Sequence, residues 1–283
     1  MVNSGIVYLD HAGTTSMDPR VLEFMMPYFS EIYGNPSSLH AVGQKARVAL
    51  DESRERVSNV LHCRPREVVF TGSGTEADNA AVQGVATALL ETGNHIITSS
   101  AEHHAVLHAC QHLETQGFDV TYLPVDSYGM IQPDAVYDAI TDRTTLVSIM
   151  YANNEIGTIQ PIADLARVAH ARGALFHTDA VQSVGKLPVD VRALDIDLLS
   201  LSAHKLNGPK GVGALWVRRG TRLTAHTTGG KQERNRRAGT ENVPAIVGLG
   251  AAAHLALDKD EADRARVAAL RDRLEAGILA GVP

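Results

Sequence analysis

The sequence has 283 residues, of which 44% are hydrophobic and 20% are charged, and its formal net charge is −6. This length allows one large domain and part of a second. The acidic balance argues against nucleic acid as the main partner, because binding to a phosphate backbone requires clustered Lys and Arg. The one basic cluster, residues 231–237, is interpreted by default as a solvated loop.

Cysteine content and hydropathy indicate the cellular compartment of the protein. Cys63 and Cys110 are the two cysteines, which are too few for a disulfide framework. The N-terminus lacks the basic region and apolar run of a signal peptide. The longest apolar stretch, residues 243–257, is too short to span a bilayer and contains His254. These features predict a cytoplasmic protein that does not associate with membranes.

Short β-rich runs alternate with segments of helical periodicity along the chain. Most of the runs are almost continuously apolar, which is typical of strands covered on both faces. The alternation predicts an α/β fold with a mainly parallel sheet of seven strands and helices on both faces. The expected strands are residues 67–71, 95–98, 119–123, 146–151, 174–178, 198–202 and 212–217.

Helices are expected between most of these strands. Asp18 and Pro19 should open one as its N-cap and first helical residue, and another should span about residues 38–61. A charged, helix-periodic segment, residues 259–279, follows the last apolar helix and is expected to lead into a second lobe. Because ligands of open α/β sheets bind beyond the carboxyl ends of the strands, chemistry is expected just after each apolar run.

The first polar motif follows the first strand, where residues 71–79 read TGSGTEADN. Small residues allow the backbone to approach a ligand, and a helix starting near Thr75 would direct free N–H groups at an anion such as phosphate. Gly72, Gly74 and Ala77 also fit a dinucleotide-binding pattern. That pattern expects an acidic residue at the end of the next strand, which instead ends in Thr-Ser-Ser.

The second motif, Ala-Glu-His-His at residues 101–104, opens a helix. At 100° per residue, His103 falls within the apolar stripe and is expected to point at the protein body. His104, His108 and His112 fall on the opposite face. Histidines four residues apart can share a metal, but a solvated face is the simpler interpretation and no metal site is expected. For His103, a core position and a functional role both stay open.

Three further motifs follow later strands. Asn153 and Asn154 either contact a ligand or form hydrogen bonds within a turn. Asp179 ends a buried strand and needs a partner, which a protonated ring nitrogen of a cofactor or a helix N-terminus would supply. Lys205 and Lys210 lie beyond another strand, beside hydroxyls and a histidine. A nearby cationic ring would lower a lysine pKa and favour the neutral amine that forms a Schiff base. The motif does not choose between the two lysines.

Together these motifs match one cofactor, pyridoxal 5′-phosphate (PLP). PLP requires a Schiff-base lysine, an acid paired with its pyridinium nitrogen and a phosphate cradle. The sequence offers Lys205, Asp179 and the loop around Thr75, each where an α/β sheet binds its ligands.

Eight segments, in order along the chain, resemble the class V aminotransferase-fold enzymes. Within that class they are most similar to the cysteine desulfurases that supply sulfur for iron–sulfur cluster or thio-cofactor assembly. The phosphate loop departs slightly, with Gly-Ser-Gly where the desulfurases usually show Ser-Gly-Ala. The segments are YLDHAGTT (8–15), YGNPSSLHAVG (33–43), FTGSGTEADN (70–79), EHHAVL (102–107), SIMYANNEIGTIQ (148–160), HTDAVQSVGKLPVD (177–190), SLSAHKLNGPKGVGALWVRR (200–219) and RRAGTEN (236–242).

The resemblance implies the fold type I of PLP-dependent transferases and roles for individual residues. The PLP-binding large domain would be residues 15–258, with residues 1–14 and 259–283 as portions of an incomplete small domain. Lys205 would form the Schiff base, and His103 would stack on the ring and transfer protons, so these two are the expected catalytic residues. Asp179, Asn154 and Gln182 would contact the ring, with Gln182 at the phenolic oxygen. The phosphate would be bound by Gly74, Thr75, Ser202 and His204, and that of a neighbouring subunit by Thr240.

The resemblance further implies a homodimer that converts L-cysteine to L-alanine. The sulfur would pass through an enzyme persulfide to an acceptor or iron–sulfur scaffold protein. The nucleophilic cysteine and the substrate-binding arginine of the family belong to a later segment than this sequence contains, so the chain is expected to be C-terminally truncated. Cys63 and Cys110 are interpreted as packed thiols. The alternatives are another class V enzyme, such as an aminotransferase or selenocysteine lyase, and a non-catalytic dimerisation or binding module.

Overall fold

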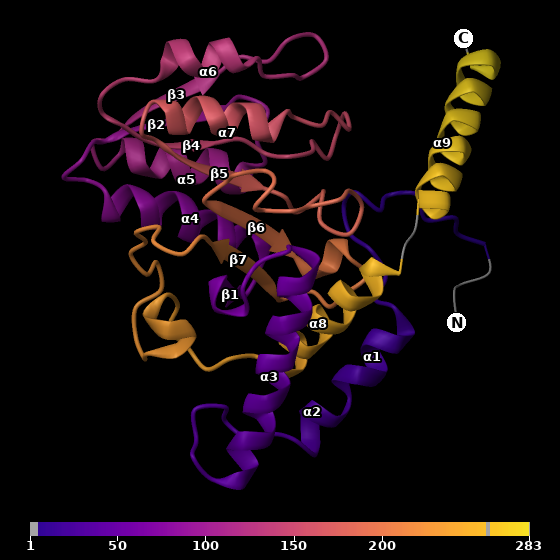
Figure 1. The fold of residues 1–283 in the computed structure, drawn as a ribbon. Coiled ribbons are helices and arrows are strands. Elements are labelled where there is room, and N and C mark those ends of the chain that lie inside the picture. Colours follow the sequence, from indigo (N-terminus) through magenta and orange to yellow (C-terminus); the bar gives the residue numbers. More distant parts are fainter. Residues whose placement is uncertain (1–4, 259–260, 283) are drawn as a thin grey trace.

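The computed structural model describes residues 5–258 and 261–282. A seven-stranded sheet of order β1-β7-β6-β5-β4-β2-β3 lies at its centre (Figure 1). Strands β2 to β6 run parallel to one another, and β7 runs antiparallel to β1 and β6. The predicted mainly parallel sheet is therefore confirmed. The strands are β1 (Val68–Thr71), β2 (His95–Ser99), β3 (Asp119–Leu123), β4 (Thr144–Ser148), β5 (Leu175–Asp179), β6 (Leu198–Ser202) and β7 (Gly213–Val217).

One predicted strand boundary differs from the structure in a way that matters for the site. The run predicted as residues 146–151 ends as a strand at Ser148. Beyond it the backbone still follows β5, since Ile149 N–H donates to the His177 carbonyl at 3.1 Å and Tyr151 N–H to the Asp179 carbonyl at 2.9 Å. This extension carries the polar residues that follow to the carboxyl edge of the sheet.

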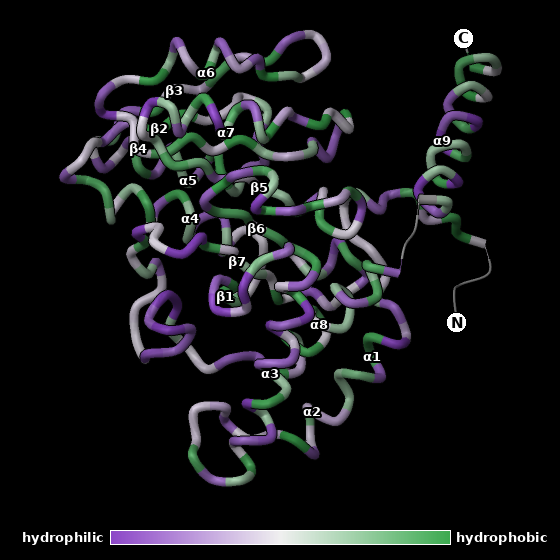
Figure 2. Tube along the Cα trace, in the orientation of Figure 1, coloured by the Kyte–Doolittle hydropathy of each residue, from purple (hydrophilic) through white to green (hydrophobic). Residues whose placement is uncertain are grey.

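Helices cover both faces of the sheet, as predicted, and neighbouring strand residues alternate between two cores. Ile96 and Leu146 pack into a core shared with α4 and α5, whereas Ile97 and Val147 belong to the core on the other face. Hydrophobic stretches follow the strands and α8 in Figure 2. The helices are α1 (Pro19–Met25), α2 (Pro27–Ser30), α3 (Ala41–Val60), α4 (Gly74–Ala88), α5 (His104–Glu114), α6 (Pro133–Ala139), α7 (Ile162–Ala171), α8 (Val243–Leu257) and α9 (Glu261–Gly281).

The predicted first helix begins as its sequence indicates. Asp18 is the N-cap of α1, and its carboxylate accepts a hydrogen bond from the Arg20 N–H at 2.9 Å, with Pro19 as the first helical residue. The predicted helix over residues 38–61 is α3, which packs along α8. Gly250 allows this close packing, because a Cβ at that position would lie 2.8 Å from Ser53.

The last helix, α9, stands apart from the sheet in Figure 1. Val267, Leu270 and Leu274 on it are each at least half exposed. It accounts for the predicted helix in 259–279, of which residues 259 and 260 lie outside the described residues, as do 1–4 and 283. The division into a large domain of residues 15–258 and small-domain portions at 1–14 and 259–283 stays a prediction. Among the described residues, the helices are too short or too polar to cross a membrane.

Candidate active site

A cavity of about 520 Å³ opens at the carboxyl ends of β5 and β6, beside the N-terminal end of α4. The structure brings all but one of the sequence-predicted site residues to its wall. These are Gly74, Thr75, His103, Asn154, Asp179, Gln182, Ser202, His204 and Lys205. The cavity is also lined by residues that the sequence analysis did not single out: Asp10, Ala12, Gly13, Ser73, Asp78, Met150, Glu155 and Val181.

Lys205 reaches the cavity from a short 3-10 helix, η2 (Ala203–Lys205), that follows β6. Its Nζ donates to the Gly13 carbonyl at 2.8 Å and to the Ala12 carbonyl. Burial lowers the pKa of Lys205, and the charges of Asp10 and Asp179 oppose that change. Lys210 is exposed and does not line the cavity. Of the two lysines that the motif left open, only Lys205 is therefore placed for chemistry in this cavity.

Asp179 is the last residue of β5 and is 5% exposed. One carboxylate oxygen, Oδ1, accepts a hydrogen bond from the Val181 N–H at 2.8 Å, which fixes the side chain against the turn after the strand. Burial raises the pKa of Asp179, whereas that hydrogen bond and the charges of His103 and Lys205 oppose the rise. A cation in the cavity would favour the ionised carboxylate further.

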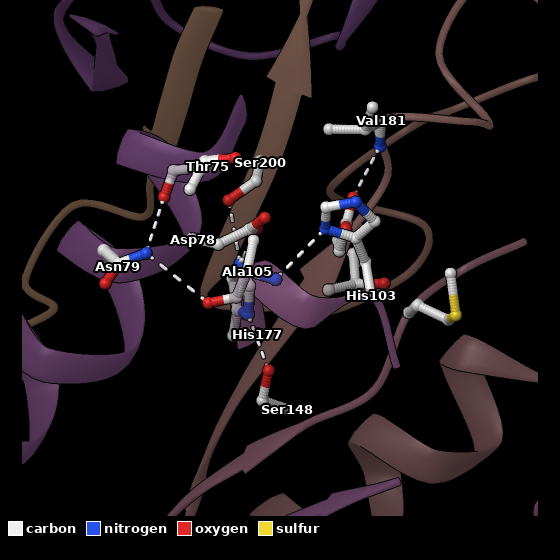
Figure 3. A network of polar contacts seen from close by, with 12 residues as sticks. Thr75, Asp78, Asn79, His103, Ala105, Ser148, His177, Val181 and Ser200 are labelled. Carbon is white, nitrogen blue, oxygen red and sulfur yellow. Dashed lines mark hydrogen bonds and ion pairs between the residues drawn. The ribbon is translucent and has the colours of Figure 1, made fainter. Parts of the chain in front are cut away.

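Figure 3 shows a buried polar network around His177 that includes Asp78, Ser148 and Ser200. The His177 ring is fully buried, with Nδ1 2.8 Å from Ser148 Oγ and Nε2 3.0 Å from Ser200 Oγ. Burial lowers the pKa of His177 to about 3, so the ring is neutral. Asp78 Oδ1 lies 3.8 Å from His177 Nε2. Burial and the charge of Asp179 raise the pKa of Asp78 well above its ordinary value.

The sequence motifs did not indicate two buried carboxyl groups at this edge, Asp78 and Glu102. Asp78 is 1% exposed and Glu102 is 6% exposed. Glu102 Oε1 accepts from the Met150 N–H at 2.8 Å, while Glu102 Oε2 and Asp78 Oδ1 have no hydrogen-bond partner. Helical spacing could have indicated Asp78, because Val82 and Val85 lie four and seven residues on and are both buried.

His103 reaches the cavity for a reason other than the predicted one. It is the N-cap of α5, with φ −63° and ψ 147°, and its Nδ1 accepts a hydrogen bond from the Ala105 N–H at 3.1 Å. Its side chain is exposed at the cavity wall. The prediction that His103 packs within the apolar stripe is wrong, because the spacing of 100° per helical residue does not apply to an N-cap residue with an extended backbone.

The other three histidines of this helix behave as predicted. His104, His108 and His112 are exposed, and the ring centroids of His104 and His108 are 5.1 Å apart. Throughout residues 5–258 and 261–282, there is no group of three or more His, Cys, Asp or Glu side chains that could hold a metal ion.

The N-terminal end of α4 forms the anion-binding part of the wall. Ser73 caps the helix, and its Oγ accepts from the Glu76 N–H at 3.0 Å. Gly74 and Thr75 come before Glu76 in the helix, so their backbone N–H groups lie at the positive end of the helix dipole. A Cβ on Gly74 would lie 2.9 Å from Val181 Cγ2 and 3.2 Å from Ser202 Cβ, so only glycine leaves the backbone this close to its surroundings.

Three polar side chains complete the wall. His204 Nδ1 is 3.0 Å from Thr14 Oγ1, and burial together with nearby lysines lowers the pKa of His204. Gln182 Nε2 donates to the Ala12 carbonyl at 2.8 Å. Asn154 Nδ2 donates to Glu155 Oε1 at 2.6 Å. Residues 10–14, before the first helix, thus close one side of the cavity.

Thr240 is the predicted site residue that lies elsewhere. It lines a separate groove of about 300 Å³ with Tyr33, Asn35 and other residues, and it does not line the cavity of its own chain. Neither cysteine lines the cavity either. Cys110 is buried and Cys63 is partly buried, and burial raises the pKa of each thiol to about 12. Both are packed thiols, as predicted.

The residues present fit PLP. An amine and a buried carboxyl group face one cavity, whose wall includes a helix N-terminus and a glycine with no room for a side chain. A sequence model described as aminotransferase class V matches residues 7–281. The chain therefore belongs to the class V aminotransferase family, whose enzymes depend on PLP.

Relatives and solved structures narrow this class. The cysteine desulfurase IscS of Methanosarcina thermophila is 52% identical over 273 residues, which are 96% of this chain and 68% of that protein. A solved NifS-like protein has a TM-score of 0.91 and 40% identity, over 98% of this chain and 75% of its own. A structure of SspA in complex with cysteine has a TM-score of 0.85 and 45% identity, over 88% and 72%.

Within the class V family, the chain groups with the cysteine desulfurases. This result supports the predicted function over the two alternatives, another class V enzyme and a non-catalytic module.

Proposed function

We propose that this chain binds PLP in the cavity and removes the sulfur atom of L-cysteine, leaving L-alanine. The observation that carries the proposal is the convergence of Lys205 and Asp179 on one cavity beside the N-terminal end of α4. When bound, PLP supplies an electron-withdrawing ring that stabilises negative charge on the amino acid attached to it. Asp179 would hold the ring nitrogen, and the α4 N-terminus with Ser202 and His204 would hold the phosphate.

Lys205 would provide the amine that carries the cofactor. Once the substrate displaces it, the same amine would act as the base that removes the proton from the substrate α-carbon. The lowered pKa favours the neutral amine that both tasks require. The carbonyl groups of Ala12 and Gly13 hold Nζ at one side of the cavity. Both carbonyls accept hydrogen bonds from Nζ and carry no formal charge, so they orient the amine without forming an ion pair with it.

His103 would stack on the ring and transfer protons through one defined nitrogen atom. Because Nδ1 accepts the Ala105 N–H, the neutral ring carries its proton on Nε2. Nε2 is then the atom that donates a hydrogen bond to the substrate. To transfer that proton, the ring would first take up a proton at Nδ1 in place of the Ala105 hydrogen bond, so that it is left neutral when Nε2 gives up its own proton.

Sulfur removal also requires an acceptor thiol. The acceptor thiolate attacks the substrate sulfur, the S–S bond forms as the C–S bond breaks, and the β-carbon takes up a proton. The products are alanine and a persulfide on the acceptor. Since Cys63 and Cys110 are packed away from the cavity with raised pKa values, neither is the acceptor.

The test of this proposal is to purify the chain with PLP and record its absorbance spectrum before and after borohydride reduction. Peptide mapping should locate the reduced adduct on Lys205, and incubation with L-cysteine and dithiothreitol as acceptor should yield alanine. Adducts scattered over exposed lysines, or cofactor bound without alanine formation, would contradict the proposal.

A second prediction concerns the two cysteines. The double variant Cys63→Ser, Cys110→Ser should form alanine with dithiothreitol within about twofold of the parent rate, since neither thiol contacts the cavity. Mass spectrometry of the parent chain after incubation with cysteine should show no added sulfur on either residue. Sulfur on Cys63 or Cys110 that disappears in Lys205→Ala would overturn this assignment.

We also propose that the chain forms a homodimer in which Thr240 reaches the phosphate of the neighbouring subunit. Thr240 lies in a groove outside its own cavity, and Tyr33, which lines the same groove, is 72% exposed. Phe29 is 60% exposed and Leu39 is 93% exposed, as expected for a surface that a second subunit covers. Sedimentation of the parent chain and of Leu39→Asp tests this surface. A sulfur-acceptor or iron–sulfur scaffold protein as partner, and the cytoplasm as location, stay predictions.

A further inference from the structure

The side-chain amide of Gln182 is held at both of its ends. Lys186, four residues on, donates from Nζ to Gln182 Oε1 at 2.6 Å. Gln182 Nε2 donates to the Ala12 carbonyl at 2.8 Å. Gln182 itself lines the cavity, whereas Lys186 does not. The lysine therefore contacts the side chain in the wall and not the space inside it.

These two contacts define which way the amide faces. An ammonium group has only donors, so it can approach only the oxygen of an amide, and a backbone carbonyl has only acceptors, so it pairs with the nitrogen. Both neighbours of Gln182 thus require the same orientation. The amide nitrogen has two N–H groups, and the Ala12 carbonyl uses one of them. The other N–H is left for a ligand in the cavity.

The charge of Lys186 also reaches the cavity wall. Burial lowers the pKa of His204, and the positive charges of Lys205, Lys210 and Lys186 lower it further. A cation bound to the amide oxygen draws electron density from the nitrogen, which strengthens N–H donation to an anionic acceptor. The half-buried position of Lys186 reduces its screening by water.

We propose that Lys186 is a positioning residue of this site, which fixes the Gln182 amide with its N–H groups toward the cavity so that Gln182 donates to an anionic oxygen of the bound cofactor. The proposal rests on the proposed binding of PLP, whose phenolic oxygen is the acceptor that the family resemblance implies for Gln182. Lys186 is not itself a catalytic residue, because it does not touch the cavity.

This role predicts a spectroscopic change. A donor at the phenolic oxygen stabilises the form of the bound cofactor in which that oxygen keeps its full negative charge. That form prevails when the nitrogen joined to Lys205 has lost its proton. Weakening the donor should therefore raise the pH midpoint of the absorbance change of bound PLP.

The experiment is a pH titration of the absorbance of the PLP-loaded chain, with PLP affinity measured in parallel. Lys186→Met keeps the aliphatic stem and removes the donor, and Lys186→Arg keeps a charged donor. Lys210→Met is the matched control, because Lys210 is exposed and also acts on His204 through its charge. Gln182→Leu, alone and combined with Lys186→Met, tests whether the lysine acts through the amide.

Lys186→Met should raise the midpoint by about 0.7 unit, equivalent to about 1 kcal/mol, and weaken PLP binding about threefold. Lys186→Arg should restore most of the midpoint, and Lys186→Met should add little in the Gln182→Leu background. An equal shift in Lys210→Met, or full additivity with Gln182→Leu, would overturn the inference. If the parent chain fails to bind PLP on Lys205, it is the proposed function that fails.

Discussion

The cavity edge of the sheet and the loop that contains Glu233 both bury carboxyl groups, but they satisfy these groups differently. At the cavity edge, Asp78 Oδ1 and Glu102 Oε2 have no hydrogen-bond partner. In the loop, both oxygens of Glu233 accept hydrogen bonds from Arg54, each at 2.7 Å, and Oε2 also accepts from the Phe70 N–H at 3.1 Å.

The difference separates two kinds of buried carboxyl group. A buried carboxyl oxygen without a hydrogen-bond partner costs free energy, so the unpaired Asp78 Oδ1 at the cavity wall indicates a ligand that completes its surroundings. A buried carboxylate with every oxygen paired needs no ligand and instead fixes its backbone. Glu233 has φ 41°, and Arg234 and Asn235 follow with positive φ, so the paired charge holds a backbone that few side chains adopt.

The largest effect is expected at the cavity. Lys205→Ala should lower alanine formation by at least about 1,000-fold, because among the described residues it removes the one lysine amine that lines the cavity. Lys210→Ala should stay within about twofold of the parent, since Lys210 is exposed. Steady-state alanine production measures both. Comparable losses of activity in the two variants would contradict the assignment of the catalytic amine to Lys205 and not to Lys210.

Sequence alone predicted the architecture well, because buried parallel strands leave continuous apolar runs that need no tertiary information. It also placed Asp179 and Lys205 at strand ends, where the sheet topology makes a site. It missed Asp78, although Val82 and Val85 lie on the same helix face, because an aspartate is usually a surface residue.

Other contacts depend on segments far apart in the chain. Lys205 meets the carbonyls of Ala12 and Gly13 only after folding, and the left-handed backbone at Glu233 has no glycine to indicate it. Helical spacing predicted that His103 points at the protein body, but its N-cap backbone does not follow that spacing.

The next largest effect is expected in the loop that contains Glu233. The Arg54 and Glu233 side chains are 5% and 2% exposed. Glu233→Gln keeps the shape of the side chain but leaves the Arg54 charge without its counterion, so it should lower the free energy of unfolding by about 3 kcal/mol. Urea denaturation followed by circular dichroism measures the change.

A matched surface pair provides the control for this variant. Arg47 and Asp51 form an ion pair at 2.9 Å on α3, with side chains 47% and 49% exposed. Asp51→Asn should cost no more than about 0.5 kcal/mol. If Glu233→Gln costs as little as Asp51→Asn, the loop is held by something other than its buried charge.

The smallest effect is expected at His170, on α7. His170 Nε2 is 2.7 Å from Asp197 Oδ2, and His170 Nδ1 is 3.5 Å from Asp195 Oδ2. The other oxygen of Asp195, Oδ1, forms an ion pair with Arg218. The hydrogen bond to Asp197 raises the pKa of His170, with smaller contributions from the charges of both aspartates, while burial and Arg218 oppose the rise. The protonated ring therefore stabilises the folded state.

Because the pKa of His170 is raised in the folded state, its stabilisation is complete below the unfolded value of about 6.5 and is lost as pH rises through the folded value. Partial exposure limits the effect to about 1 kcal/mol. The free energy of unfolding should fall between pH 6 and pH 8 more steeply in the parent chain than in His170→Gln, with His108→Gln, an exposed position on α5, following the parent. Identical slopes in the parent and His170→Gln would show that the ring is neutral in the folded state, and that this cluster, unlike the Glu233 loop, gains nothing from its charge.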